Sequence, residues 1–187
     1  MEKEIGIKSD IILFMNTSYP FFNKVKTYKE IEKIAEELRT QGKKIVMVSG
    51  CYDIVHLGHV QFLLDAKAKG DVLIVSVASD GVIRQLKGPE RPVMDQQYRA
   101  SMLASLIPVD YVVIDDEPLQ LPHRINFEQL LSIIKPNFFA VNNTDNAIDI
   151  EYKKQLVSKY GAELIIIDIV STYIIHTSEI VEKIKKL

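Results

Sequence analysis

The feature that most constrains the fold is a series of short, continuously apolar runs, each followed by a segment with helical periodicity. These runs are Ile45–Val48, Val72–Ala78, Tyr111–Ile114, Phe138–Val141 and Leu164–Ile169. A strand with one solvated face would alternate polar and apolar residues, whereas a continuously apolar strand is buried on both faces. Such strands, alternating with helices, predict a doubly wound α/β fold with a parallel sheet. In such folds ligands bind in the loops that leave the carboxyl ends of the strands.

The segments between the runs carry helix signals. Thr27 and Glu30 have the spacing of a capping box, and the apolar stripe that follows them stops near Gly42. Further helical spacing is found at Phe62–Gly70, Val82–Leu86, Tyr98–Leu106, Phe127–Ile134, Ile150–Tyr160 and Glu179–Lys186. Residues 1–26 have weak periodicity, so the sequence predicts an N-terminal extension at 1–26 and one domain at 27–187.

Composition limits the classes of function. The chain has 187 residues with 47% hydrophobic content, enough for the core of one domain. Its 23 basic and 25 acidic residues give a net charge of -2, which provides no electrostatic footprint for nucleic acid or an anionic membrane. Cys51 is the single cysteine, so no internal disulfide forms, and the run Ile11–Met15 is too short for a signal peptide. No apolar stretch reaches membrane-spanning length, and a cytoplasmic location is expected.

The most informative stretch is residues 50–59, Gly-Cys-Tyr-Asp-Ile-Val-His-Leu-Gly-His, between the first apolar run and a helix. His56 and His59 are three residues apart at the helix start, so they share one face beside backbone amides that favour an anion. Gly58 removes a side chain where a triphosphate would approach closely. Two alternatives are a metal site made by the histidines with Asp53, and histidines that only cap the helix.

These residues resemble the cytidylyltransferase-like nucleotidyltransferase superfamily, whose signature is Gly-x-Phe-Asp-x-x-His-x-Gly-His, with Tyr52 in place of the phenylalanine. The resemblance implies a Rossmann-like nucleotidyltransferase fold. It also implies that His56 and His59 contact the triphosphate and stabilise the transition state at the α-phosphorus, without a covalent enzyme intermediate. By analogy with oxyanion holes, each such donor contributes roughly 2.7–4 kcal/mol, about a hundredfold in rate.

A second cluster is the basic loop at residues 84–92, which glycine and proline punctuate, with Arg99 on the helix that follows. Displacement of pyrophosphate builds negative charge on the leaving group, so Lys87 and Arg91 are candidate catalytic residues, in a role that Mg²⁺ shares. The alternatives are a solvated charged turn and, for Arg99, an ordinary surface charge on a helix.

The likeness is more specific to the adenylyltransferases that make nucleotide-activated heptose, and it extends over about residues 28–187. It implies that Asp80 lies near the nucleotide, although Asp80 also suits a helix N-cap. Two departures are evident: Asn142 replaces a phosphate-binding lysine of the pattern Val-Lys-Gly-Gly-Asp, and the segment His176–Val181 differs from the usual Ser-Thr-Thr-x-Ile-Ile. The candidate nucleotide-binding residues are Gly50, Cys51, Tyr52, Asp53, Gly58, Asp80, Arg99, Asn142, Asp145, Thr177 and Ser178.

The predicted function is a Mg²⁺-dependent transfer of AMP from ATP to a sugar 1-phosphate, such as D-glycero-D-manno-heptose 1-phosphate, with release of pyrophosphate. One alternative is a cytidylyltransferase that acts on glycerol 3-phosphate, ethanolamine phosphate or a similar alcohol phosphate. Another is a nucleotide-binding module that has lost turnover. The expected partners are a nucleoside triphosphate and a phosphorylated small molecule, and the resemblance favours a homodimer.

Overall fold

In the computed structural model, the described residues are 19–119, 125–143, 145–169 and 177–186. Most of the predicted N-terminal extension therefore lies outside the described residues, as do Thr144 and His176. The side chain of Ser178, a candidate nucleotide contact, also lies outside what is described.

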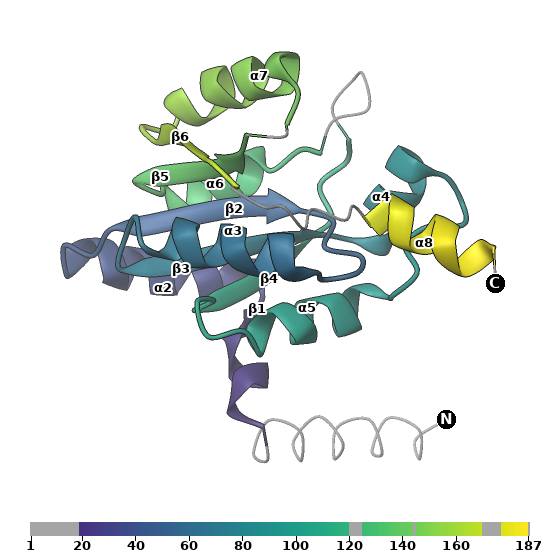
Figure 1. The fold of residues 1–187 in the computed structure, drawn as a ribbon. Coiled ribbons are helices and arrows are strands. Elements are labelled where there is room, and N and C mark those ends of the chain that lie inside the picture. Colours follow the sequence, from purple (N-terminus) through teal and green to yellow (C-terminus); the bar gives the residue numbers. More distant parts are fainter. Residues whose placement is uncertain (1–18, 120–124, 144, 170–176, 187) are drawn as a thin grey trace.

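A parallel sheet in the order β1-β4-β3-β2-β5-β6 forms the centre of the described chain (Figure 1). Its strands are β1 (Val25–Lys26), β2 (Ile45–Gly50), β3 (Val72–Ala78), β4 (Tyr111–Asp115), β5 (Phe138–Asn142) and β6 (Glu163–Ile167). All pairings between neighbouring strands are parallel. Every residue of β3 is buried, as a continuously apolar strand in a covered sheet requires. The predicted parallel α/β fold is confirmed.

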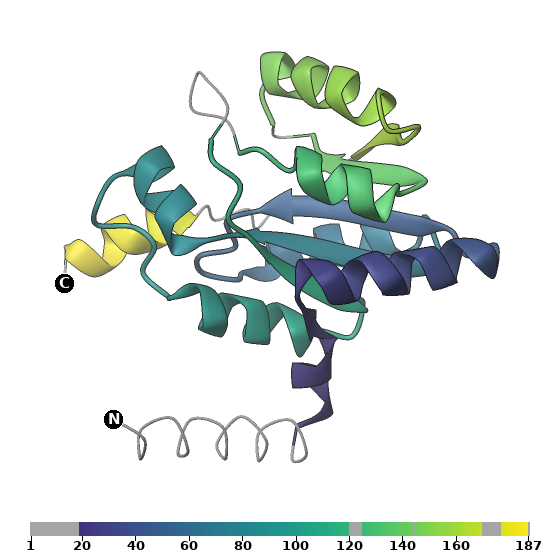
Figure 2. The same cartoon turned by 180° about the vertical axis from the view of Figure 1, so that it is seen from behind.

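Helices cover both faces of this sheet (Figures 1 and 2). Helices α2 (Tyr28–Thr40), α6 (Glu128–Ile134) and α7 (Ala147–Ser158) contribute to the apolar cluster on one face, and α3 (Leu57–Lys67) and α5 (Gln96–Ala104) to the cluster on the other. Helices α4 (Asp80–Lys87) and α8 (Thr177–Lys185) lie beyond the carboxyl edge of the sheet (Figure 1). Within the described part of the chain, no helix has both the length and the apolar character needed to cross a bilayer.

The helix starts show how local sequence fixes these elements. The Oγ1 of Thr27 accepts a hydrogen bond from the Glu30 amide at 3.3 Å, and Oε2 of Glu30 accepts one from the Thr27 amide at 2.8 Å. The predicted capping box of α2 is therefore confirmed. At α4 the cap is Ser79, whose Oγ accepts from the Val82 amide at 3.3 Å, and Asp80 is already the first helical residue. The alternative interpretation of Asp80 as an N-cap was wrong.

The sheet begins inside the segment that the sequence treats as an extension. The short 3₁₀ helix η1 (Pro20–Lys24) leads into β1, which pairs with β4 at Val25↔Val112. The Nζ of Lys24 donates to the carbonyl oxygen of Val109 at 2.8 Å, at the turn that follows α5. The part of residues 1–26 that the structure describes is thus bound to the edge of the domain.

The strand order identifies where a ligand can enter. After β2 the chain continues on one side of the sheet to β3 and β4, and it then crosses to the opposite side of β2 to form β5 and β6. The β2–β5 pairing covers only Val46↔Phe138 and Met47↔Phe139. Helices leave the ends of these two strands in opposite directions, so a crevice opens at the carboxyl ends of β2 and β5.

Candidate active site

A pocket lies at this crevice. Its lining comes from the end of β2 and the loop after it, from α3, and from the end of β5, the loop after it and the middle of α7, with one residue from the segment before α6. The lining residues are Ser49, Gly50, Cys51, Tyr52, His59, Phe62, Ile125, Ala140, Val141, Asn142, Asp145 and Lys153. The pocket therefore brings together four residues of the motif at residues 50–59 with Asn142 at the end of β5 and Asp145 after it, both of which the sequence singled out.

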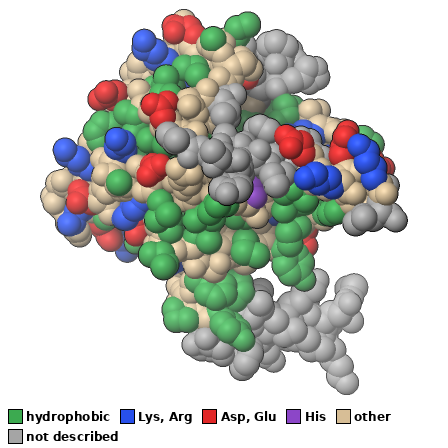
Figure 3. Space-filling view, viewed as in Figure 1, with side chains coloured by type: hydrophobic (Ala, Val, Ile, Leu, Met, Phe, Trp, Pro, Cys, Tyr) green, Lys and Arg blue, Asp and Glu red, His purple; other side chains and the backbone are tan. Residues whose placement is uncertain are grey.

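The two histidines lie together at the N-terminus of α3. His56 occupies the N-cap position in an extended conformation, and its backbone amide contacts Nδ1 of His59 at 3.4 Å. The two rings are stacked, with centroids 3.8 Å apart and planes 26° apart. Because Nδ1 of His59 accepts this contact, the proton of the neutral ring is on Nε2. The helix N-terminus adds a partial positive charge, so this corner of the site suits an anion. Histidine atoms reach the molecular surface (Figure 3).

Both glycines of the motif make room for neighbouring rings. A Cβ atom on Gly58 would lie 3.2 Å from Cε1 and Nδ1 of His56, and one on Gly50 would lie 3.0 Å from Cε2 of Tyr52. The sequence assigned Gly58 to close approach of a triphosphate, and the structure supplies a reason within the protein itself. A side chain at Gly58 would push the His56 ring out of its stack.

Tyr52 forms the floor beside His59. Its ring is buried and meets the His59 ring edge-on, with centroids 5.3 Å apart. Its backbone has a φ of 48°, in the left-handed region that few residues other than glycine adopt. Burial raises the pKa of the Tyr52 hydroxyl, and the nearby Asp145 carboxylate raises it further. Tyr52 therefore stays neutral and shapes the pocket through its ring.

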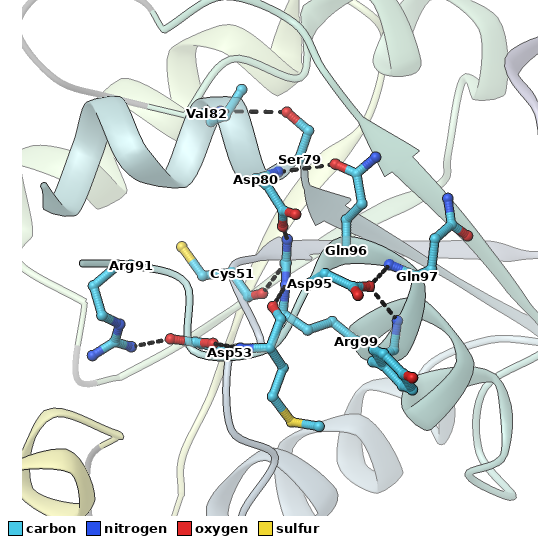
Figure 4. A network of polar contacts seen from close by, with 12 residues as sticks. Cys51, Asp53, Ser79, Asp80, Val82, Arg91, Asp95, Gln96, Gln97 and Arg99 are labelled. Carbon is cyan, nitrogen blue, oxygen red and sulfur yellow. Dashed lines mark hydrogen bonds and ion pairs between the residues drawn. The ribbon is translucent and has the colours of Figure 1, made fainter. Parts of the chain in front are cut away.

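Asp53 and Arg91 join the motif to the basic loop (Figure 4). Asp53 is only 3% exposed, and its Oδ1 accepts hydrogen bonds from the amides of Val93 at 2.8 Å and Met94 at 3.0 Å. Its Oδ2 forms an ion pair with Nη2 of Arg91 at 2.5 Å. The structure thus places Arg91 against a carboxylate of the motif, where part of its guanidinium charge is already balanced.

Arg99 is the centre of the network drawn in Figure 4. Its side chain, fully buried, donates to the carbonyl oxygen of Cys51 at 2.6 Å, to that of Met94 at 3.0 Å and to Oδ1 of Asp80 at 2.7 Å. The alternative that Arg99 is a surface charge is therefore wrong. One guanidinium thus joins the motif loop, the segment after the basic loop and the start of α4.

Lys87 occupies the last turn of α4. It is exposed, as the alternative of a solvated charged turn predicts, yet it lies close to the motif. Burial raises the pKa of the Cys51 thiol, while the Lys87 and Arg99 charges act in the opposite direction. Cys51 therefore stays a thiol near neutral pH. The ammonium group of Lys87 therefore lies beside Cys51 in the motif loop.

At the β5 end of the pocket the charges come from Asp145 and Lys153. Oδ2 of Asp145 pairs with Nζ of Lys153, two turns into α7, at 2.5 Å. The sequence analysis found Asp145 but missed Lys153, which belongs to no motif; only its position on the helix that follows Asp145 could have indicated it. Thr177, at the start of α8, donates from Oγ1 to the carbonyl oxygen of Ile54 at 3.4 Å, so α8 meets the motif loop.

The end of β4 carries a buried acidic group that the sequence also missed. Asp115 accepts hydrogen bonds from the Tyr28 hydroxyl at 2.7 Å, the Ser76 hydroxyl at 3.0 Å and the Glu117 amide at 3.1 Å. Desolvation raises the pKa of Asp115 and of Glu117. These bonds tie α2 and the neighbouring strands together near the site, which is a structural role.

The described residues contain no group of three or more His, Cys, Asp or Glu side chains placed to hold a metal ion. The two histidines stack on each other, and Asp53 is occupied by the basic loop. Within the described ranges, the alternative of a His-x-x-His metal centre completed by Asp53 therefore has no support.

Comparison with known proteins points to one family. The model of the cytidylyltransferase-like family matches residues 47–183. The bifunctional protein HldE of Nitratiruptor sp. is 41% identical over 161 residues, which make up 86% of this chain and 32% of that protein. HldE of Helicobacter pylori is 34% identical over 186 residues, covering 100% of this chain and 36% of that protein. The chain thus spans about a third of the length of these curated relatives.

Solved structures share the fold. The lipopolysaccharide core biosynthesis protein from Thermoplasma volcanium has a TM-score of 0.56 and 28% identity, covering 71% of this chain and all of that one. A pantoate-beta-alanine ligase from Francisella tularensis has a TM-score of 0.57 and 23% identity, over 77% of this chain and 66% of that one. The second likeness concerns the fold alone.

Proposed function

The chain belongs to the cytidylyltransferase-like family, and from that premise we propose that it transfers AMP from ATP to a sugar 1-phosphate, with release of pyrophosphate. The observation that carries the proposal is the stacked pair His56 and His59 at the N-terminus of α3, inside the family match and at the crevice between β2 and β5. Two imidazoles and a helix N-terminus directed at one region suit a polyphosphate.

The reaction is a single in-line displacement at the α-phosphorus. An oxygen of the acceptor phosphate forms a bond to this phosphorus while the bond to the bridging oxygen of the pyrophosphate breaks. The acceptor phosphate is already ionised near neutral pH, since its second pKa is about 6, so no general base is required. His56 and His59 donate hydrogen bonds to phosphate oxygens, which gain negative charge in the transition state.

The basic loop divides into two roles. Lys87 is exposed at the end of α4 near Cys51, and it is proposed to meet the leaving pyrophosphate directly. Arg91 pairs with Asp53 through Nη2 alone, so its other N–H groups can donate to the pyrophosphate while the ion pair is kept. We therefore assign Lys87 the larger share of leaving-group stabilisation and Arg91, whose charge Asp53 partly balances, the smaller share.

Mg²⁺ is proposed to enter with the triphosphate. This ion keeps several waters and binds to substrate phosphates with few protein ligands. When bound, it would neutralise charge on the β- and γ-phosphates.

The acceptor and the assembly are proposed on narrower grounds. Three likenesses support a sugar phosphate: to heptose adenylyltransferases, to the HldE relatives, and to the Thermoplasma volcanium protein, which is described as a lipopolysaccharide core biosynthesis protein. We name D-glycero-D-manno-heptose 1-phosphate as the first candidate.

A homodimer is proposed on the resemblance and on the exposed apolar side chains of α3 and α5. These side chains are Leu57, Leu64, Tyr98 and Met102. Light scattering of the purified chain measures its mass directly.

The test is pyrophosphate release in the presence of Mg²⁺, with ATP, CTP, GTP and UTP each combined with heptose 1-phosphate, glycerol 3-phosphate and ethanolamine phosphate. Turnover that requires ATP and heptose 1-phosphate supports the proposal. Turnover with CTP and an alcohol phosphate would keep the mechanism and replace both substrates. Nucleotide binding without release for any pair would favour a binding module, an outcome for which the neutral Asn142 gives a specific reason.

A further inference from the structure

Asp115, at the end of β4, is a buried carboxylate that the proposed reaction does not use. It is 1% exposed, and among the described residues its side chain is bonded only to neutral donors, with no lysine, arginine or histidine paired to it. Burial of a charge costs free energy unless the charge is paired or well hydrogen-bonded. The bond from Tyr28 ties α2 to β4, whereas the bond from Ser76 leads across β3 toward β2.

A row of three side chains connects Asp115 to the pocket. Strands β4, β3 and β2 are neighbours in the sheet (Figure 1), and Ser76 of β3 lies beside Ser49 of β2 in the register. The Oγ of Ser76 is 3.0 Å from Oδ2 of Asp115 and 3.4 Å from Oγ of Ser49. Ser76 is fully buried, whereas Ser49 is half-buried and lines the pocket. One buried serine therefore links the carboxylate to a residue that a substrate can touch.

The bonds around Asp115 favour its ionised form. Burial raises the pKa of Asp115 above its usual 3.8, and the negative charge of Asp116 acts in the same direction. The hydrogen bonds from Tyr28, the Glu117 amide and Ser76 lower the pKa, because they stabilise the charged carboxylate. With three donors directed at it, the carboxylate stays ionised near neutral pH.

The number of protons in the row fixes the direction of its hydrogen bonds. A hydroxyl group has one proton, and an ionised carboxylate can only accept, so Ser76 donates its proton to Asp115. Ser76 can then only accept from Ser49, and among the described residues Ser76 is the only hydrogen-bond partner of the Ser49 hydroxyl. The Ser49 proton is thus turned away from the pocket, and lone pairs of its oxygen face the ligand.

An oxygen that presents lone pairs selects its partner. A phosphate oxygen only accepts, so it has no hydrogen bond to make with Ser49 in this state, whereas a hydroxyl or amino group can donate to it. Resting on the proposed function, we infer that Ser49 accepts a hydrogen bond from a hydroxyl or amino group of a substrate, and that Asp115 and Ser76 are positioning residues that set this direction. ATP and the sugar acceptor both carry such groups.

Replacement of Asp115 by asparagine reverses the direction and keeps the shape. The amide oxygen of the new side chain can accept from Tyr28 and from the Glu117 amide, while its NH₂ group donates to Ser76. Ser76 then donates to Ser49, and the Ser49 proton is directed into the pocket. There it meets the donor group of the substrate, so the hydrogen bond is lost although no group that touches the substrate has been removed.

The experiment measures binding of ATP and of inorganic pyrophosphate to the full chain by titration calorimetry near neutral pH, and the KM for heptose 1-phosphate by pyrophosphate release. The variants are Ser49→Ala, Asp115→Asn, the double variant and the control Ser132→Ala, an exposed serine of α6. One neutral hydrogen bond corresponds to about 3–10-fold in affinity. Ser49→Ala and Asp115→Asn should each weaken ATP or the acceptor by about this factor, and which of the two is weakened identifies the source of the donor group.

The double variant separates positioning from a purely structural role. If Asp115 acts through Ser49, its replacement has no further effect once the Ser49 hydroxyl is gone, whereas a general disturbance of the fold would lower the affinity in both backgrounds. The double variant should therefore bind as Ser49→Ala does. Pyrophosphate should bind equally to all variants, and Ser132→Ala should match the wild type throughout.

Thermal unfolding checks that each variant is folded, and Ser76→Ala, which breaks the same row, takes the place of an Asp115→Asn protein that is not. Additive losses in the double variant, wild-type affinity of Asp115→Asn for both substrates, or an equal loss of pyrophosphate affinity in Ser49→Ala would overturn the inference. A wild type that releases no pyrophosphate with any acceptor refutes the proposed function, and the ATP titrations then decide the inference alone.

Discussion

Replacing Arg99 with methionine tests how the site is held together. Methionine has a similar length and can occupy the buried space, but it donates no hydrogen bonds. The substitution leaves two buried carbonyl oxygens, of Cys51 and Met94, and the Asp80 carboxylate without their donor. The Asp80 side chain is partly exposed and recovers some hydration, whereas the Arg99 side chain has no exposure that water could use.

The magnitude follows from these contacts. Breaking a buried charged pair by removing one partner costs about 3–5 kcal/mol, and each unsatisfied carbonyl costs about 1–3 kcal/mol on its own. These values are not additive for one side chain, and we expect a loss of about 3–5 kcal/mol in the free energy of unfolding. For a domain of this length that corresponds to a decrease in Tm of about 6–20 °C.

Urea unfolding of the wild type, Arg99→Met and Arg84→Met measures this loss. Arg84 is an exposed arginine on α4, so its replacement controls for the removal of a positive charge near the site. We expect Arg84→Met to change the free energy of unfolding by less than about 0.5 kcal/mol. A loss below about 1 kcal/mol for Arg99→Met would refute the reasoning, because it would mean that the buried hydrogen bonds are not maintained in solution.

Three further predictions concern the pocket and its surroundings. His59→Ala should reduce turnover at least about a hundredfold, measured by pyrophosphate release, with little change in thermal unfolding; an unchanged rate would remove the histidine pair from the mechanism. Gly58→Ala should also lower turnover, because its new Cβ would lie 3.2 Å from the His56 ring, and a variant as active as the wild type would show that the ring stack is not needed. The pKa of Glu117 is raised above 4.5 in the folded protein, so the unfolded chain releases this proton first and stability falls as pH rises from about 4.5 to the raised value. Glu117→Gln, whose amide oxygen can keep the bonds from Gln129 and Leu130, should flatten this fall in pH-dependent urea unfolding, and an identical pH profile would contradict the assignment.

The strands could be predicted from the sequence because burial on both faces leaves a local signal. Val72–Ala78 is continuously apolar apart from Ser76, and the structure assigns the strand the same bounds. The capping box at Thr27 is equally local, since its partners are three residues apart. By contrast, β1 is only two residues long and has no periodicity to detect. Helix α7 begins at Ala147, before the predicted Ile150, because Asn146 provides the cap.

The site could be predicted from the sequence where several of its residues lie in one short segment. The motif at residues 50–59 contains both histidines and both glycines, so its position after a strand was enough to indicate an anion site. Arg99 could not be understood in this way, because its partner Cys51 lies 48 residues away and only the folded chain brings them together. Lys153 was missed for the same reason. Its place in the pocket depends on the ion pair with Asp145, and no sequence motif includes it.

The central claim is that the histidine pair promotes direct transfer of AMP from ATP to the acceptor phosphate. The most direct measurement uses ATP labelled at the α-phosphorus. The labelled ATP is incubated with heptose 1-phosphate, Mg²⁺ and either the wild type or His59→Ala, and the product that carries the label is identified. We predict that the label appears in a nucleotide sugar, with one pyrophosphate released for each molecule formed, and that His59→Ala slows both at least about a hundredfold. Pyrophosphate release without labelled nucleotide sugar, or label transfer that does not depend on His59, would contradict the account.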